Sequence, residues 1–273
     1  MNIQWYPGHM TKALRQMKED MKLIDLVIEI LDARVPISSR NPDIDELASG
    51  KARMVILNKS DLADPDAVSG WGEYFKEKGF ICIPLDSRSR NGMDKIRAQC
   101  REACAEKIER DRRRGIKNRP VRAMVAGIPN VGKSTFINSF AGRASTKTGN
   151  KPGVTRGAQW IRIDKQLELL DTPGILWPKF EDMTVGRNLA LIGSINDEVV
   201  SISELCEFLI GYMSENYPQV LDERYEGRDL TAVSKRLGCI GKGGEFDLDR
   251  AERGFLDDYR SGRLGRISLE VAP

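Results

Sequence analysis

The sequence predicts an α/β fold, in which a mostly parallel, doubly wound sheet is followed by a small all-α domain. Up to about residue 174, short apolar runs bounded by turn residues alternate with amphipathic stretches. This alternation is typical of parallel strands joined by helices. Beyond Pro178 the strand pattern fades and helical periodicities remain. We therefore expect one domain over residues 1–178 and a helical C-terminal domain over residues 179–273.

Apolar runs in the first part predict six strands, the last two of which form a hairpin. These runs are Leu26–Leu31, Met54–Leu57, Phe80–Ile83, Val121–Ala126, Trp160–Ile163 and Leu167–Leu170. Amphipathic stretches such as Thr11–Leu23 and Met93–Ile108 predict the helices between them. In the second part, apolar residues at helical spacing predict three helices, and Pro218 ends the first of them. These three are Ser203–Asn216, Leu230–Leu237 and Leu248–Tyr259.

The composition excludes several classes of protein. The chain has 273 residues, of which 40% are hydrophobic and 30% charged, enough for a globular α/β core and a smaller second domain. No stretch approaches the roughly 20 apolar residues of a membrane span, and the N-terminus lacks the apolar core of a signal peptide. The five cysteines form no CxxC pair and the chain has one histidine, which argues against a zinc site. We expect reduced, buried thiols and a cytoplasmic protein.

The net charge of +3 hides an asymmetry along the chain. Residues 1–174 hold 31 basic and 22 acidic residues, whereas residues 175–273 hold 12 and 18. The stretch Lys107–Arg119 alone holds seven basic residues, and it is either a solvated helix end and linker or a nucleic-acid contact. The basic first part suits a polyanionic partner that is contacted mainly through it.

A phosphate-binding loop follows the strand that ends at Ala126. Residues 127–134 read GIPNVGKS and fit the pattern GxxxxGK[ST] between a strand and a helix. The glycines allow backbone N–H groups to turn toward phosphate oxygens at a helix N-terminus. Lys133 is expected to neutralise phosphate charge and Ser134 to ligate Mg²⁺. The full phosphate-contacting set is Asn130, Val131, Gly132, Lys133, Ser134 and Thr135.

Two further segments match the loops that respond to the γ-phosphate. Asp171 to Gly174 reads DTPG and lies 38 residues after Lys133. Alone it is also a plain turn sequence, but at this spacing Asp171 is expected to hold Mg²⁺ through water and the Gly174 amide to meet the γ-phosphate. The loop between the two motifs contains Thr155, whose hydroxyl is expected to close over Mg²⁺. We interpret that loop as a switch segment.

The base-recognition motif comes ahead of the phosphate loop. Residues 58–61 read NKSD at the end of a strand. The Asp61 carboxylate matches the two donors of guanine and finds no such pair on adenine, Lys59 can lie along the base, and Asn58 can tie this loop to the phosphate loop. Ser87 and Arg88 follow the next strand, where a backbone amide can reach guanine O6. The sequence therefore predicts a P-loop GTPase domain that is circularly permuted, since the spacing within each half is intact.

The catalytic polar group has to come from an unusual place. The residue after Gly174 is Ile175, so the glutamine that orients water in Ras-like enzymes has no counterpart there. Asn130 can ligate a monovalent cation against the phosphates. The permutation also brings the N-terminal segment, residues 1–10, near DTPG, which makes His9 either a catalytic residue or a surface bystander.

The motif set resembles the RbgA/YlqF family of bacterial, circularly permuted ribosome-assembly GTPases. The resemblance rests on QWYPGHM at residues 4–10, then NKSD, GIPNVGKST, PGVT and DTPG in that order, and a trailing helical domain. It implies binding to a late precursor of the large (50S) ribosomal subunit, particle-stimulated hydrolysis, Mg²⁺ dependence and K⁺ activation. It also implies K⁺ at Asn130, a catalytic histidine at His9, and rRNA contact by the helical domain. Because that domain is acidic, we favour the first domain and the linker as the rRNA contact.

Three functions are compatible with the sequence. The first is a GTP hydrolase in which His9, Lys133 and Thr155 are catalytic. The second is a GTP-gated rRNA-binding factor whose hydrolysis times its release. The third is a GTPase of tRNA modification, for which the sequence offers no second chemical site. We expect a monomer that contacts neither membrane nor DNA.

Overall fold

The protein is described by a computed structural model that covers residues 8–116, 119–142, 158–177 and 182–273, with only the backbone of residues 8–13. Within these residues, six strands form a single sheet, in the order β3-β2-β1-β4-β6-β5. Their bounds are β1 Leu26–Asp32, β2 Ala52–Asn58, β3 Ile81–Leu85, β4 Val121–Ala126, β5 Gln159–Arg162 and β6 Leu167–Asp171. All neighbours are parallel except β5 and β6, which form the predicted antiparallel hairpin.

The sheet explains how the permuted chain rebuilds one nucleotide site. β1 pairs in parallel with β4 although about 90 residues separate them, with Leu26 opposite Ala123. From that central pair, β2 and β3 extend the sheet in one direction and β6 and β5 extend it in the other. The strand order therefore reverses between β1 and β4. The carboxyl ends of the five parallel strands meet at one edge, where open α/β sheets bind ligands. The predicted α/β fold is confirmed.

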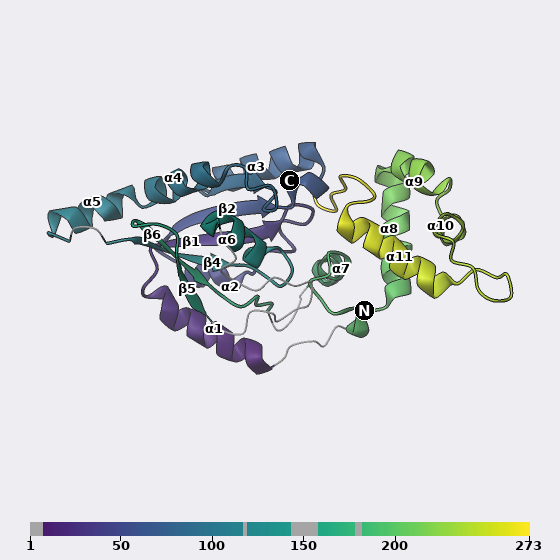
Figure 1. The fold of residues 1–273 in the computed structure, drawn as a ribbon, viewed down its shortest axis with the longest axis horizontal. Helices are drawn as coiled ribbons and strands as arrows, with labels where there is room; N and C mark the ends of the chain where they lie inside the picture. Colours follow the sequence, from purple (N-terminus) through teal and green to yellow (C-terminus); the bar gives the residue numbers. More distant parts are fainter. Residues whose placement is uncertain (1–7, 117–118, 143–157, 178–181) are drawn as a thin grey trace.

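Helices cover the sheet, and α8 to α11 form a second cluster of helices, the helical group. α3 to α5 lie along one side of the sheet, α1 lies on the other side, and α8 to α11 gather beyond α7 (Figure 1). The helices are α1 Gly8–Met21, α2 Asp43–Leu47, α3 Pro65–Glu77, α4 Met93–Ala103, α5 Ala105–Arg113, α6 Lys133–Ala141, α7 Met183–Leu191, α8 Ile202–Asn216, α9 Pro218–Tyr225, α10 Leu230–Leu237 and α11 Leu248–Ser261, with short 3₁₀ turns at Ser60–Leu62 and Asp197–Val199.

The structure differs from the sequence prediction at two helices. The expected helix over residues 93–108 is broken at Cys104, whose backbone (φ −107°, ψ 11°) leaves the helical range and separates α4 from α5. Pro218 ends α8 as predicted, but it also begins the unpredicted helix α9. Proline is well suited to the first position of a helix, since the N–H it lacks would have no partner there.

The hydrophobic core joins the two parts of the chain. One buried cluster runs from the sheet, for example Leu26, through Leu189 of α7 to Leu209 and Phe255 of the helical group. A second, smaller cluster packs α3 against β1 and β2. All five cysteines are free thiols, and all are buried except the half-buried Cys82. None of the helices in the described ranges is long and apolar enough to cross a membrane.

After α11 the chain returns to the first part of the molecule. The Ile267 N–H donates to Leu62 O (3.0 Å) and the Leu269 N–H donates to Arg34 O (2.9 Å). The Glu270 carboxylate accepts from the Ile37 N–H at 2.8 Å. The C-terminus therefore lies beside α3 (Figure 1). Residues 267–270 belong to the predicted helical domain but contact the first part of the chain. The domain boundary at residues 178–179 therefore stays a prediction.

Candidate nucleotide-binding site

Five loops meet at the carboxyl edge of the sheet. The P-loop follows β4, NKSD overlaps the end of β2, Asp86–Arg88 follows β3, DTPG begins at the end of β6, and Asp32–Arg34 lies at the end of β1. The first four were predicted as functional segments. They are brought together because parallel strands all present the same end at one edge.

Backbone geometry explains the glycines of the P-loop. Gly132 has φ +97°, and a Cβ there would lie 2.3 Å from Nδ2 of Asn58. A Cβ on Gly127 would lie 2.6 Å from Ile30 O. Side chains are thus excluded at both positions by close neighbours. α6 begins at Lys133, and Ser134 and Thr135 lie half-buried in its first turn.

Lys133 and Asp171 form the charged centre of the site. Nζ of the buried Lys133 donates to Ile128 O at 2.7 Å, and burial lowers the pKa of Lys133 to about 8. Asp171 is 1% exposed, and burial raises its pKa to about 6 against the opposing effect of the Lys133 charge. Neither carboxylate oxygen of Asp171 has a hydrogen-bond partner among the described residues. Buried polar atoms normally have partners, so these two oxygens fit a bound Mg²⁺ ion or its water ligands.

The DTPG loop packs directly on the P-loop. A Cβ on Gly174 would lie 2.8 Å from Pro129 N and 2.9 Å from Lys133 Nζ. The Thr172 hydroxyl donates to Val125 O at 2.8 Å and anchors the start of the loop to β4. The backbone of Gly174 therefore lies beside the lysine predicted to contact phosphate.

Asn58 links three loops, which includes the predicted tie to the P-loop. Its Nδ2 donates to Val131 O at 2.7 Å. Its Oδ1 accepts from both the backbone N–H (3.1 Å) and the hydroxyl (2.7 Å) of Ser87. Lys59, in left-handed backbone conformation at φ 57°, donates from Nζ to Asn130 O at 2.8 Å. Hydrogen bonds from Asn58 and Lys59 thus link the loops expected around the base to the loop expected around the phosphates.

Asp61 is paired with Arg88 in this structure. The Arg88 guanidinium contacts Oδ2 of Asp61, whereas Oδ1 of Asp61 is buried and has no hydrogen-bond partner in the described part of the chain. The Arg88 N–H donates to Oδ1 of Asp86 at 2.9 Å, so this amide and that of Ser87 are both engaged. That a backbone amide of this loop reaches guanine O6 stays a prediction.

Two predicted residues cannot be placed at the site. His9 lies in the first turn of α1, and its side chain is outside the described residues, as is the whole segment 1–7. Thr155, with its loop, also lies outside the described residues. Their roles stay predictions.

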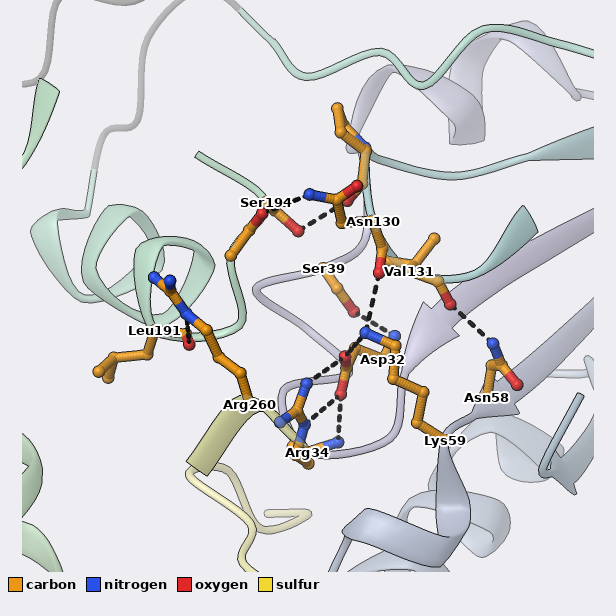
Figure 2. Close-up of polar contacts among 12 residues, drawn as sticks. Asp32, Arg34, Ser39, Asn58, Lys59, Asn130, Val131, Leu191, Ser194 and Arg260 are labelled. Atoms are coloured by element: carbon orange, nitrogen blue, oxygen red, sulfur yellow. Dashed lines mark hydrogen bonds and ion pairs between the residues drawn. The ribbon is translucent and has the colours of Figure 1, made fainter. Parts of the chain in front are cut away.

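The structure adds a buried ionic cluster that the motif search missed (Figure 2). Asp32 is fully buried and accepts from Arg34 Nε (2.9 Å), Arg34 Nη2 (2.8 Å) and Lys59 Nζ (2.8 Å). Burial by itself raises the pKa of Asp32, but the charges of Arg34 and Lys59 outweigh it and hold the pKa below its usual range. The signal in the sequence was a pair of opposite charges, Asp32 and Arg34, at the end of a mostly apolar strand.

The sheet topology, the P-loop and the NKSD loop beside it define a P-loop GTPase domain with circularly permuted motifs. The family model of the 50S ribosome-binding GTPase matches residues 122–227. Ribosome biogenesis GTPase A of Bacillus cereus is 46% identical over 279 aligned residues, which cover 99% of this chain and 94% of that protein. Its Thermotoga maritima counterpart is 32% identical, over 98% and 94% of the two chains. The chain belongs to the ribosome biogenesis GTPase A family, and it is a GTPase.

Solved structures agree with this assignment. The crystal structure of GNP-bound YlqF from T. maritima matches with a TM-score of 0.68 at 26% identity, over 96% of this chain and 98% of that one. The GDP-bound structure of the T. maritima protein matches with a TM-score of 0.67. The similarity extends through the helical group as well as the sheet.

Proposed function

We propose that this GTPase acts on a late precursor of the large (50S) ribosomal subunit, and that the particle stimulates hydrolysis. The observation that carries the hydrolytic site is the juxtaposition of Lys133, Asp171 and Gly174 at the sheet edge. The partner is supported by the 50S ribosome-binding description of the matching family model and by the names of the relatives.

The site residues divide into three groups. Asn58, Lys59, Asp61, Ser87 and Arg88 serve the guanine base. The P-loop residues Asn130, Val131, Gly132, Lys133, Ser134 and Thr135, together with Gly174, serve the phosphates. Ser134, Thr155 and Asp171 hold Mg²⁺, which supplies charge neutralisation at the phosphates. Supporting this, Asp171 has two buried carboxylate oxygens without hydrogen-bond partners in the described ranges.

Water positioning requires a group outside the DTPG loop. Ile175 and Leu176 are buried apolar side chains, so neither orients water. We assign K⁺ to Asn130 and the role of a catalytic group to His9. Asn130 Nδ2 donates to Gly193 O at 2.6 Å. That bond uses the amide nitrogen, whereas the amide oxygen is the atom able to ligate a cation.

The rRNA contact is assigned to the first domain and the linker. Of the basic residues between 107 and 119, Arg110, Arg112, Arg113 and Arg114 are exposed on or next to α5. Lys107 and Arg119 instead pair with Asp25 and Asp111. Arg112 and Arg113 pair with the exposed Glu109, and exposed pairs of this kind are weak enough to give way to a phosphate contact. We propose that the protein acts as a cytoplasmic monomer without DNA or membrane contact.

The decisive experiment measures GTP turnover with and without purified 50S particles, in K⁺ and in Na⁺. The proposal expects stimulation by the particles and further stimulation by K⁺. Particles that leave turnover unchanged would contradict the assigned partner, and equal rates in Na⁺ would contradict the K⁺ site. A His9→Ala variant that keeps full particle-stimulated turnover would remove His9 from the mechanism.

A second candidate is a GTP-gated binding factor whose hydrolysis times release. It is favoured by the hydrogen bonds that join the P-loop to the turn after α7, because the nucleotide site is then joined to the segment that leads into the helical group. A non-hydrolysable GTP analogue should retain the protein on large-subunit precursors. Equal retention with GDP would argue against gating.

A further inference from the structure

Arg260, near the end of α11, holds the C-terminal end of α7. Its Nε donates to Leu191 O (3.0 Å) and its Nη2 to Ala190 O (2.7 Å). The same guanidinium pairs with both carboxylate oxygens of Asp197, at 2.8 and 2.7 Å. The last carbonyls of a helix have no partner within the helix, and a cation there also meets the negative end of the helix dipole. Arg260 therefore caps the C-terminal end of α7 and ties it to α11.

The turn that leaves α7 holds the P-loop (Figure 2). Gly193 O accepts from Nδ2 of Asn130 at 2.6 Å, and the buried Ser194 hydroxyl donates to Pro129 O at 2.7 Å. A Cβ on Gly193 would lie 3.5 Å from Nε of Arg260, so the arginine packs against this turn. One side chain of α11 thus supports the turn that contacts two consecutive P-loop residues.

The residue before Arg260 reaches the P-loop by another route. The Tyr259 carbonyl accepts from Nη1 of Arg34 at 3.3 Å, and the guanidinium lies 5.0 Å from the tyrosine ring centre. Arg34 pairs with Asp32, which pairs with Lys59, whose Nζ donates to Asn130 O. Both routes end on Asn130, one on its side chain and one on its carbonyl. Asn130 has a left-handed backbone at φ 62°, a conformation that asparagine adopts more readily than most residues but that is still uncommon outside glycine.

We propose that Arg260 is a positioning residue for the nucleotide. It acts through the Gly193–Ser194 turn, which holds the Pro129–Asn130 segment in the conformation that aims P-loop amides at phosphate. The proposal rests on the P-loop as the phosphate site and requires neither K⁺ nor a ribosomal particle. It makes the attachment of the helical group to α7 a determinant of nucleotide affinity.

The test is a double-mutant cycle in which the rate of mant-GDP release is measured in the presence of Mg²⁺. The variants are Arg260→Gln, Ser194→Ala and their combination. Each single change removes hydrogen bonds that support one segment, and we expect about 5-fold faster release from each. Because both act through one turn, the double variant should also release about 5-fold faster, whereas independent effects would multiply to about 25-fold.

Arg263→Gln is the matched control. Arg263 lies three residues further along the chain and pairs with Asp257 and Asp258, so its loss also removes a guanidinium from the end of α11. It should leave mant-GDP release within 2-fold of wild type and should not change the effect of Ser194→Ala. Arg260→Lys, which keeps a cation, should recover part of the loss.

Three results would overturn the assignment. These are wild-type release from Arg260→Gln, an effect of Arg263→Gln equal to that of Arg260→Gln, or a double variant near 25-fold. None of these depends on turnover, so a wild-type protein that binds mant-GDP without particle stimulation contradicts only the proposed function. A wild-type protein that does not bind mant-GDP contradicts both.

Discussion

Replacing Asp32 by asparagine tests the buried ionic cluster most directly. Asparagine keeps the shape of the side chain but removes the charge and replaces one acceptor oxygen with a donor NH₂ group. Arg34, which is 1% exposed, and Lys59 would then face a neutral side chain, and one of them would face a donor. The carboxylate that now accepts three side-chain hydrogen bonds from them would be lost.

The expected loss in free energy of unfolding follows from the burial of the two residues that pair with Asp32. Removing one member of a buried ion pair costs roughly 3–5 kcal/mol, because the other charge stays buried without compensation. Lys59 keeps Asn130 O as an acceptor and Arg34 keeps Tyr259 O, so we take the lower end, about 3 kcal/mol. At about 2–4 °C per kcal/mol, this corresponds to a fall in Tm of roughly 6–12 °C.

The assay is urea and thermal unfolding of the nucleotide-free protein at pH 7. The informative comparison is the double variant Asp32→Asn/Arg34→Met, in which one of the uncompensated charges is also removed, so it should be more stable than Asp32→Asn alone. Asp257→Asn is the control, because Asp257 is 69% exposed in its pair with Arg263 and should cost at most about 1 kcal/mol. A loss below about 1 kcal/mol for Asp32→Asn, or a double variant no more stable than the single one, would refute the reasoning.

Three further changes test the site. Because the pKa of Asp171 is raised to about 6 and that of Lys133 is lowered to about 8, affinity for the Mg²⁺ complex of mant-GTPγS should be highest between these two values and should fall as the pH drops through 6. Asp171→Asn should flatten the fall on the acid side, and an identical profile in that variant would contradict the role of Asp171. Gly132→Ala would put a Cβ 2.3 Å from Asn58 Nδ2 and should weaken mant-GDP binding at least about 10-fold, whereas Gly115→Ala, also at positive φ but in open space, should not. Asp61→Asn should cost about 1–3 kcal/mol of guanine-nucleotide affinity, measured by titration; if ATP competes equally with GTP for the wild-type protein, the base assignment is wrong.

The local motifs could be predicted from the sequence because their geometry is set within a few residues. A phosphate loop needs glycines and a lysine at fixed short spacing, and the strand before it needs an apolar run, so both are visible without a structure. The parallel sheet followed from the same alternation. Helix α9 was missed because Pro218 is equally suited to follow one helix and to begin the next. The break at Cys104 has no counterpart in the periodicity of residues 93–108.

The sequence by itself determined the class of nucleotide, the permuted order of the motifs and the edge of the sheet at which they meet. Only the tertiary structure decided how those motifs are held. Arg34 and Tyr259, which share a hydrogen bond, are 225 residues apart, and 69 separate Arg260 from Leu191. No spacing rule relates such pairs, because their contact depends on how α7 and α11 pack beside the sheet. The support of Asn130 from the helical group is therefore a property of the folded chain.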